Sequence, residues 1–135
     1  MNGWVDTHCH LPDDPEEAAA LVAEAGAQGV STLITVGCDR ASSLLNRDHA
    51  ARFENVHFTV GLHPHEARHG VETIADLFDD GGDDGDRPGP IAVGECGLDY
   101  HYDHSPRAAQ RDAFARQIAI AHRRGLPLVI HTREA

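Results

Sequence analysis

The sequence predicts an α/β protein of the TIM-barrel (β/α)₈ type in which only about strands 1–5 are present. Three observations predict this class. Short apolar runs alternate with helical segments, which is typical of parallel βαβ units. Polar residues follow the apolar runs, where a parallel barrel keeps its active site. The chain has 135 residues, whereas a complete barrel typically needs roughly 250. We therefore expect residues 1–135 to be the N-terminal part of one barrel domain, with its C-terminal part absent.

The expected elements alternate along the chain without a linker that would divide it. In chain order they are strand 3–6, helix 15–28, strand 30–37, helix 41–53, strand 56–62, helix 71–78, loop 79–90, strand 91–95, a helix that begins at 105–106 and runs to 124, and strand 126–131. A flavodoxin-like or Rossmann sheet gives the same alternation. The nucleotide-binding versions of these folds are disfavoured because no GxGxxG or P-loop sequence follows the first strand.

Residues typical of helix ends support these boundaries. Asp14 suits an N-cap, Pro15 suits the first helical position, and Glu17 completes a capping box. Ser105 and Pro106 are expected to begin the last helix, and Gly125 to end it. The residues expected to form the buried stripe of that helix are Phe114, Ile118 and Ala121.

Composition limits the classes of function. The net charge is −11, from 22 acidic residues against 11 basic ones, all of them arginine. An acidic chain is a poor non-specific binder of nucleic acid, which argues against a DNA-binding module. It argues less against a nuclease, because bound divalent cations supply positive charge locally. Three cysteines without a CxxC pair, no signal peptide and no long apolar run predict a cytoplasmic protein that does not contact a membrane.

A candidate metal centre comes from polar residues at the expected strand ends. His8 and His10 follow the first strand, Glu95 the fourth and His131 the fifth. Side chains two apart in an extended segment point the same way, so both imidazoles of the pair can face one site. Imidazole suits Zn, Mn, Fe or Co, and a carboxylate broadens that choice. Asp6 lies on the same face as the pair and is expected to orient His8 or His10 without binding the metal itself.

The histidine pair and Glu95 each have an alternative explanation that involves no metal. An isolated His-x-His sequence is often two surface histidines. Glu95 after a buried strand needs a partner, which an arginine or a helix N-terminus can also supply. The metal reading is favoured because the ends of parallel strands converge on one face.

Four motifs, in order and at matching intervals, resemble the TatD family of metal-dependent deoxyribonucleases over essentially the whole chain. The motifs are Asp6-Thr7-His8-Cys9-His10-Leu11, Gly61-Leu62-His63-Pro64-His65, Gly94-Glu95-Cys96-Gly97-Leu98-Asp99-Tyr100 and the segment 126–135, LPLVIHTREA. Gln110, Phe114 and Gln117 match the helix between the last two motifs.

The resemblance implies a barrel hydrolase with two divalent ions (Mg, Mn or Zn) per complete site. His8 and His10 would hold one ion, Glu95 would bridge both, and His131 would hold the second. In the family a histidine after strand six and an aspartate after strand eight complete the site. Those strands lie beyond Ala135, so catalysis by residues 1–135 alone is not expected.

The implied reaction is cleavage of DNA phosphodiester bonds by metal-activated water, with Glu95 as the catalytic residue within this chain. His63, His65 and Arg133 are candidates for holding the substrate phosphate. Asp99 and Tyr100 are expected to shape the loop after the fourth strand rather than to touch substrate. DNA is the expected substrate, and no obligate protein partner is evident.

Two other functions stay open. An amidohydrolase-like barrel would cleave C–N or ester bonds at a similar site. A lysine available for carbamylation would favour that reading, but the chain has none. The second alternative is a non-catalytic metal-binding fragment, which the short length supports.

Overall fold

A computed structural model describes residues 3–79 and 89–135 of the chain. The strands are β1 (Trp4–Cys9), β2 (Val30–Thr35), β3 (Val56–Val60), β4 (Ala92–Asp99) and β5 (Leu128–Arg133). The helices are α1 (Pro15–Ala27), α2 (Arg40–Arg52) and α3 (Arg107–Arg124), with 3-10 helices η1 (Pro64–His69), η2 (Val71–Thr73) and η3 (Ala75–Phe78). Most of the predicted acidic loop lies outside the described residues.

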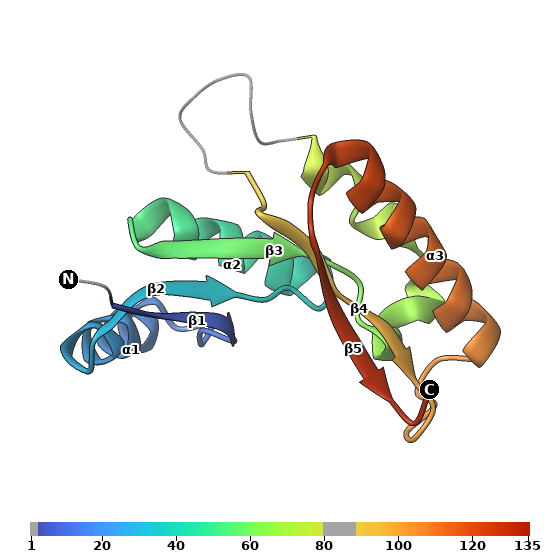
Figure 1. The fold of residues 1–135 in the computed structure, drawn as a ribbon, viewed down its shortest axis with the longest axis horizontal. Helices are drawn as coiled ribbons and strands as arrows, with labels where there is room; N and C mark the ends of the chain where they lie inside the picture. Colours follow the sequence, from blue (N-terminus) through green and yellow to red (C-terminus); the bar gives the residue numbers. More distant parts are fainter. Residues whose placement is uncertain (1–2, 80–88) are drawn as a thin grey trace.

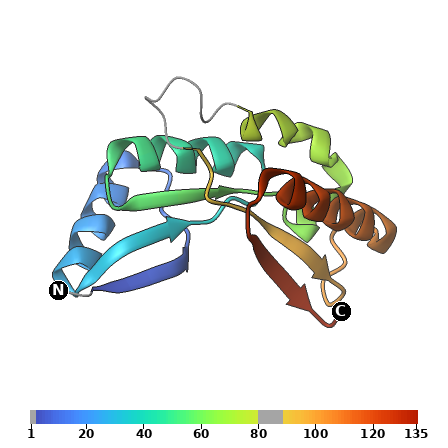
Figure 2. The ribbon, with the colours of Figure 1, turned by 45° about the horizontal axis from the view of Figure 1, so that its top comes forward.

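The five strands form one parallel sheet in the order β1-β2-β3-β4-β5. Each strand therefore pairs with its neighbour in sequence, as in a TIM barrel. The sheet arches, and the helices lie along its outer side (Figures 1 and 2). The structure is a curled half-barrel, which confirms the predicted fold class.

The predicted N-cap of α1 and the predicted end of α3 are confirmed, whereas the capping box expected from Glu17 is not among the contacts of α1. Asp14 caps α1, because its Oδ1 accepts hydrogen bonds from the backbone N–H groups of Glu16 and Glu17 at 2.9 Å each. Gly125 ends α3 with φ of 64°, a left-handed conformation that glycine adopts without steric cost.

Two expectations for α3 are wrong. Ser105 does not cap the helix; its hydroxyl instead donates to the His65 carbonyl and accepts from the Arg68 N–H. The predicted apolar stripe is only partly buried, since Ile118 is 42% exposed. The buried stripe is Gln110, Ala113, Gln117, Ile120 and Ala121. Polar glutamines occupy this face because they bind the backbone of neighbouring segments.

The predicted helix 71–78 is two 3-10 helices, and η1 was not predicted at all. The buried residues Val71, Ile74 and Leu77 recur every three positions, which matches the three-residue turn of a 3-10 helix better than an α-helix. They pack with Phe58, Val60 and Val93 of the sheet and with Ile120 of α3 in the larger hydrophobic core.

The strands β4 and β5 extend further than predicted, because they pair as far as Asp99 opposite Arg133. Glu95 and His131 consequently lie inside their strands rather than at the ends. Gly97 makes this pairing possible, since a Cβ at that position would overlap the carbonyl oxygen of His131. The close approach brings His131 beside the two carboxylates of β4.

Candidate metal centre

Glu95 lies at the centre of the candidate site. Its side chain is on β4 and only 8% of the residue is exposed. Oε2 lies 3.4 Å from His8 Nε2, and Oε1 lies 3.1 Å from His131 Nδ1 and 4.0 Å from His63 Nε2. Histidines from three different strand regions thus surround one buried carboxylate.

The predicted pair His8 and His10 comes together as expected. Their ring centroids are 5.2 Å apart. His10 Nδ1 lies 3.1 Å from the Val36 carbonyl oxygen. A carbonyl only accepts hydrogen bonds, so Nδ1 carries the hydrogen and Nε2 of the neutral ring keeps a free lone pair. This is the protonation pattern of a metal-ligating histidine.

Asp6 holds the main chain of this segment. Its Oδ1 accepts a hydrogen bond of 3.0 Å from the backbone N–H of His8. The orienting contact on the His10 ring comes instead from Val36. Sequence reasoning did not identify Val36, because a backbone carbonyl leaves no signal in residue type.

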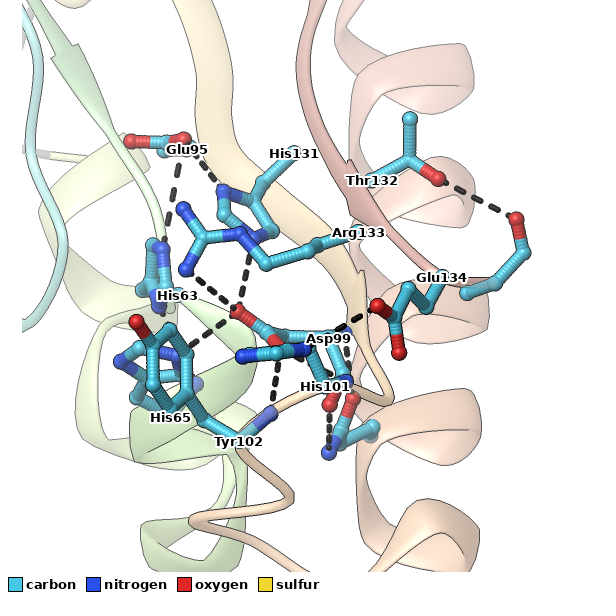
Figure 3. Close-up of polar contacts among 12 residues, drawn as sticks. His63, His65, Glu95, Asp99, His101, Tyr102, His131, Thr132, Arg133 and Glu134 are labelled. Atoms are coloured by element: carbon cyan, nitrogen blue, oxygen red, sulfur yellow. Dashed lines mark hydrogen bonds and ion pairs between the residues drawn. The ribbon is translucent and has the colours of Figure 1, made fainter.

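His131 lies between two carboxylates of β4 (Figure 3). Nδ1 faces Glu95 Oε1 at 3.1 Å, and Nε2 lies 3.0 Å from Asp99 Oδ2. Both carboxylates are buried, Asp99 completely. Burial raises the pKa of Asp99, but hydrogen bonds from the Tyr102 backbone, His65 and His131, with the charge of Arg133, outweigh it and hold that pKa well below its usual range.

His63 and His65 lie together at the start of η1. The backbone N–H of His65 donates to His63 Nδ1 at 3.1 Å, so in the neutral ring His63 Nε2 carries the hydrogen and is a donor. Burial lowers the pKa of His63 to about 4, although the charge of Glu95 opposes the shift. His65 Nε2 lies 2.9 Å from Asp99 Oδ2.

Two groups of potential metal ligands share Glu95. One is His8, His10 and Glu95; the other is His63, Glu95 and His131, and within each group the ligand atoms lie within 4.8 Å of one another. Imidazole nitrogens with a carboxylate suit Zn²⁺ and Mn²⁺. His8, His10, Glu95 and His131 therefore fit a divalent metal centre, whereas His63 is a donor at Nε2 in its neutral form.

An open pocket lies beside the site. It is lined by Cys38, Asp39, His63, His65, Glu66, His131 and Arg133. The Arg133 guanidinium lies 5.0 Å from the centroid of the Tyr102 ring and 3.6 Å from Asp99 Oδ2. Three of the lining residues, His63, His65 and Arg133, are the predicted phosphate-binding candidates, which the fold brings together.

Two buried glutamines of α3 fix the backbone on either side of this pocket. Gln117 Oε1 accepts from the Leu62 N–H at 2.8 Å, and its Nε2 donates to the Leu62 carbonyl at 3.0 Å. Gln110 makes the same pair of bonds with Asp99, at 2.8 and 3.0 Å. The sequence marks both glutamines only through the family resemblance, so their structural role is a finding of the fold.

Comparison with known proteins agrees with this geometry. The family model described as TatD related DNase matches residues 5–135. The chain belongs to this family. A relative from Bacillus subtilis, the "uncharacterized metal-dependent hydrolase YabD", is 31% identical over 96% of this chain and 51% of its own length. A "3'-5' ssDNA/RNA exonuclease TatD" from Enterobacter lignolyticus is 31% identical over 92% of this chain and 46% of its own.

Solved structures of TatD proteins show the same fold. The Escherichia coli TatD homologue YJJV has a TM-score of 0.73 and 25% identity, covering 97% of this chain and 51% of that one. The TatD chain described here thus spans about half the length of the curated relatives it matches. Within residues 3–79 and 89–135, no helix is long and apolar enough to cross a membrane.

Proposed function

We propose that this TatD chain supplies the metal-binding half of a hydrolase that cleaves phosphodiester bonds in DNA. The observation that carries the proposal is the position of Glu95, a buried carboxylate shared by two groups of potential metal ligands. The names of relatives support hydrolysis in general, and one names single-stranded DNA and RNA as substrates of that protein.

The proposed ligands divide into two sets. His8 and His10 would hold one ion, His131 would hold a second, and Glu95 would bridge them as the catalytic residue. When bound, divalent ions such as Mg²⁺, Mn²⁺ or Zn²⁺ supply activated water and neutralise phosphate charge. Glu95 would place a negative charge between His8 and His10 on one side and His131 on the other. Because Glu95 is buried, this charge is shielded from bulk water.

His63 and Arg133 are proposed to bind the substrate phosphate. The Nε2–H of His63 is a donor that already points toward Glu95, and the Arg133 guanidinium stands at the rim of the same pocket. Such donors suit phosphate oxygens. His65 lines the pocket too, but its Nε2 is bound to Asp99, so its proposed role is to hold the pocket wall.

The test is hydrolysis by the protein that carries this chain, with single-stranded DNA labelled at one end, and with amide and simple ester substrates in parallel. We expect nucleotide release in Mg²⁺ or Mn²⁺, none in EDTA, and a loss of most of the rate in Glu95→Gln. Glu24→Gln, on the exposed side of α1, is the matched control and should keep the wild-type rate.

Three results would contradict the proposal. Nuclease activity that survives chelation would exclude the metal mechanism. Near-normal activity of Glu95→Gln would make Glu95 structural. Hydrolysis of amides or esters but not of DNA would favour the amidohydrolase-like alternative.

We also propose a cytoplasmic location. Cys9, Cys38 and Cys96 are free thiols, and burial raises the pKa of each, to about 11 for Cys9 and about 12 for the other two. Such thiols are unreactive, as expected of reduced structural cysteines. Cell fractionation with a reporter fusion checks this location, and enrichment in another compartment would contradict it.

A further inference from the structure

Asp99 makes more polar contacts in the site than a residue that only shapes a loop requires. Its Oδ1 accepts hydrogen bonds from the backbone N–H groups of His101 and Tyr102, at 3.1 and 3.0 Å. Its Oδ2 lies 2.9 Å from His65 Nε2 and 3.0 Å from His131 Nε2 (Figure 3). Each oxygen thus has its own set of partners.

These contacts determine which nitrogen of His131 carries the hydrogen. An ionised carboxylate only accepts hydrogen bonds, so the Nε2 atom facing it must be a donor. In the neutral ring, Nδ1 then keeps its lone pair and faces Glu95 Oε1 at 3.1 Å. A lone pair and a carboxylate oxygen repel each other at this distance unless they share a proton or a metal ion. With a metal ion, the arrangement is that of a carboxylate–histidine–metal triad.

The position of Asp99 is itself fixed by α3. Gln110 binds both the N–H and the carbonyl of Asp99, and its Nε2 also donates to the Ser105 carbonyl at 2.9 Å. Gln110 and Asp99 are both fully buried. Rotation of the Asp99 carboxylate would break the hydrogen bonds that its Oδ1 accepts from the His101 and Tyr102 N–H groups. The carboxylate therefore keeps its orientation toward His131.

We propose that Asp99 is a positioning residue, which holds His131 as the Nε2–H tautomer and so aims Nδ1 at a cation shared with Glu95. This inference rests on the proposed metal centre. Asp99 is not proposed as a ligand, because both of its oxygens are bound by protein groups and it is completely buried. His65 shares Oδ2 with His131 and stabilises the carboxylate from the other side.

The decisive variant is Asp99→Asn, which keeps the size of the side chain. Its amide oxygen can still accept from the two backbone N–H groups, which places the NH₂ group against His131 Nε2. That group donates, so the favoured tautomer of His131 becomes Nδ1–H and the ligating lone pair is lost. Asp103→Asn is the matched control, since Asp103 is exposed and pairs with Arg107 instead.

The first measurement is the tautomer of His131 in metal-free protein, from long-range ¹H–¹⁵N spectra in mildly alkaline solution, with His131→Ala to assign the signal. We expect Nε2–H in the wild type and in Asp103→Asn, and Nδ1–H in Asp99→Asn. An Nδ1–H tautomer in the wild type would overturn the proposal without any variant, even if Asp99→Asn failed to fold.

The second measurement is calorimetric titration with Zn²⁺ or Mn²⁺. We expect Asp99→Asn to lose about 10- to 100-fold in affinity at the His131 site, with His8 and His10 binding unchanged. Wild-type affinity together with a lower melting temperature would show that Asp99 is only structural. No metal binding by the wild type would overturn the proposed function, and the tautomer measurement would still decide whether Asp99 sets the state of His131.

Discussion

Three histidines of the candidate centre, His10, His63 and His131, each have one ring nitrogen bound by a protein group other than Glu95. His10 Nδ1 contacts the Val36 carbonyl, His63 Nδ1 accepts from the His65 N–H, and His131 Nε2 contacts Asp99. These second contacts fix both ring orientation and tautomer. They leave a free lone pair on His10 Nε2 and on His131 Nδ1, and they give His63 a donor at Nε2. The difference separates the proposed ligands from the proposed phosphate contact.

Removing the histidine pair should weaken metal binding by this chain. We expect the double variant His8→Ala/His10→Ala to lose at least about tenfold in Zn²⁺ or Mn²⁺ affinity, because one set of nitrogen ligands disappears. Calorimetry measures the change. His57→Ala, an exposed histidine on β3, is the control and should bind like the wild type. Equal binding by the double variant and the wild type would refute the assignment.

At the scale of elements, α3 both covers the sheet and anchors the site. Its buried face carries Gln110 and Gln117, two helical turns apart, and each binds both backbone polar groups of one residue. One of these residues precedes His63 and the other is Asp99. The helix therefore sets the distance between the segment that carries His63 and the end of β4.

Replacing Gln117 with methionine tests this anchor. The Leu62 N–H and carbonyl would lose their partners in a buried environment, where each unpaired group costs about 1–3 kcal/mol. We expect the free energy of unfolding to fall by about 2–4 kcal/mol, measured by urea denaturation. Gln28→Met, at the exposed end of α1, should change it by less than about 0.5 kcal/mol. A loss at Gln117 no larger than at Gln28 would show that the Leu62 contacts contribute little.

The start of α1 offers a second test at this scale. Asp14→Ala removes the acceptor of two backbone N–H groups and should cost about 1 kcal/mol of stability. The neighbouring Asp13→Ala, which removes an exposed carboxylate, is the control. Thermal unfolding compares the two variants, and equal melting temperatures would mean that the cap is not significant.

At the scale of the whole molecule, the described half-barrel has two sheet edges. In the described part of the chain, β1 pairs only with β2, and β5 only with β4. Apolar side chains are exposed beside these edges: Trp4 is 77% exposed, Val5 52% and Ile130 55%. Unpaired strand edges with apolar side chains promote association, which a closed barrel avoids.

We therefore expect the isolated 135-residue chain to self-associate, measured by light scattering at increasing concentration. Ile130→Arg should reduce the association, because a charge on an edge strand opposes pairing. Ile118→Arg, on the outer side of α3, is the control and should have less effect. A stable monomer that unfolds cooperatively and has native-like nuclease rates would contradict this expectation.

The sequence by itself determined the order of the elements, the parallel barrel class and the metal-ligand candidates. These depend on local signals, namely apolar periodicity, the Asp14 cap, Gly125 and polar residues that follow apolar runs. Tertiary structure decided the rest. The lengths of β4 and β5 depend on pairing between strands, which Gly97 permits by its lack of a side chain. The roles of Gln110, Gln117 and Asp99 depend on which backbone groups and ring nitrogens lie opposite them. Those partners are distant in sequence, so only the folded chain brings them within hydrogen-bonding distance.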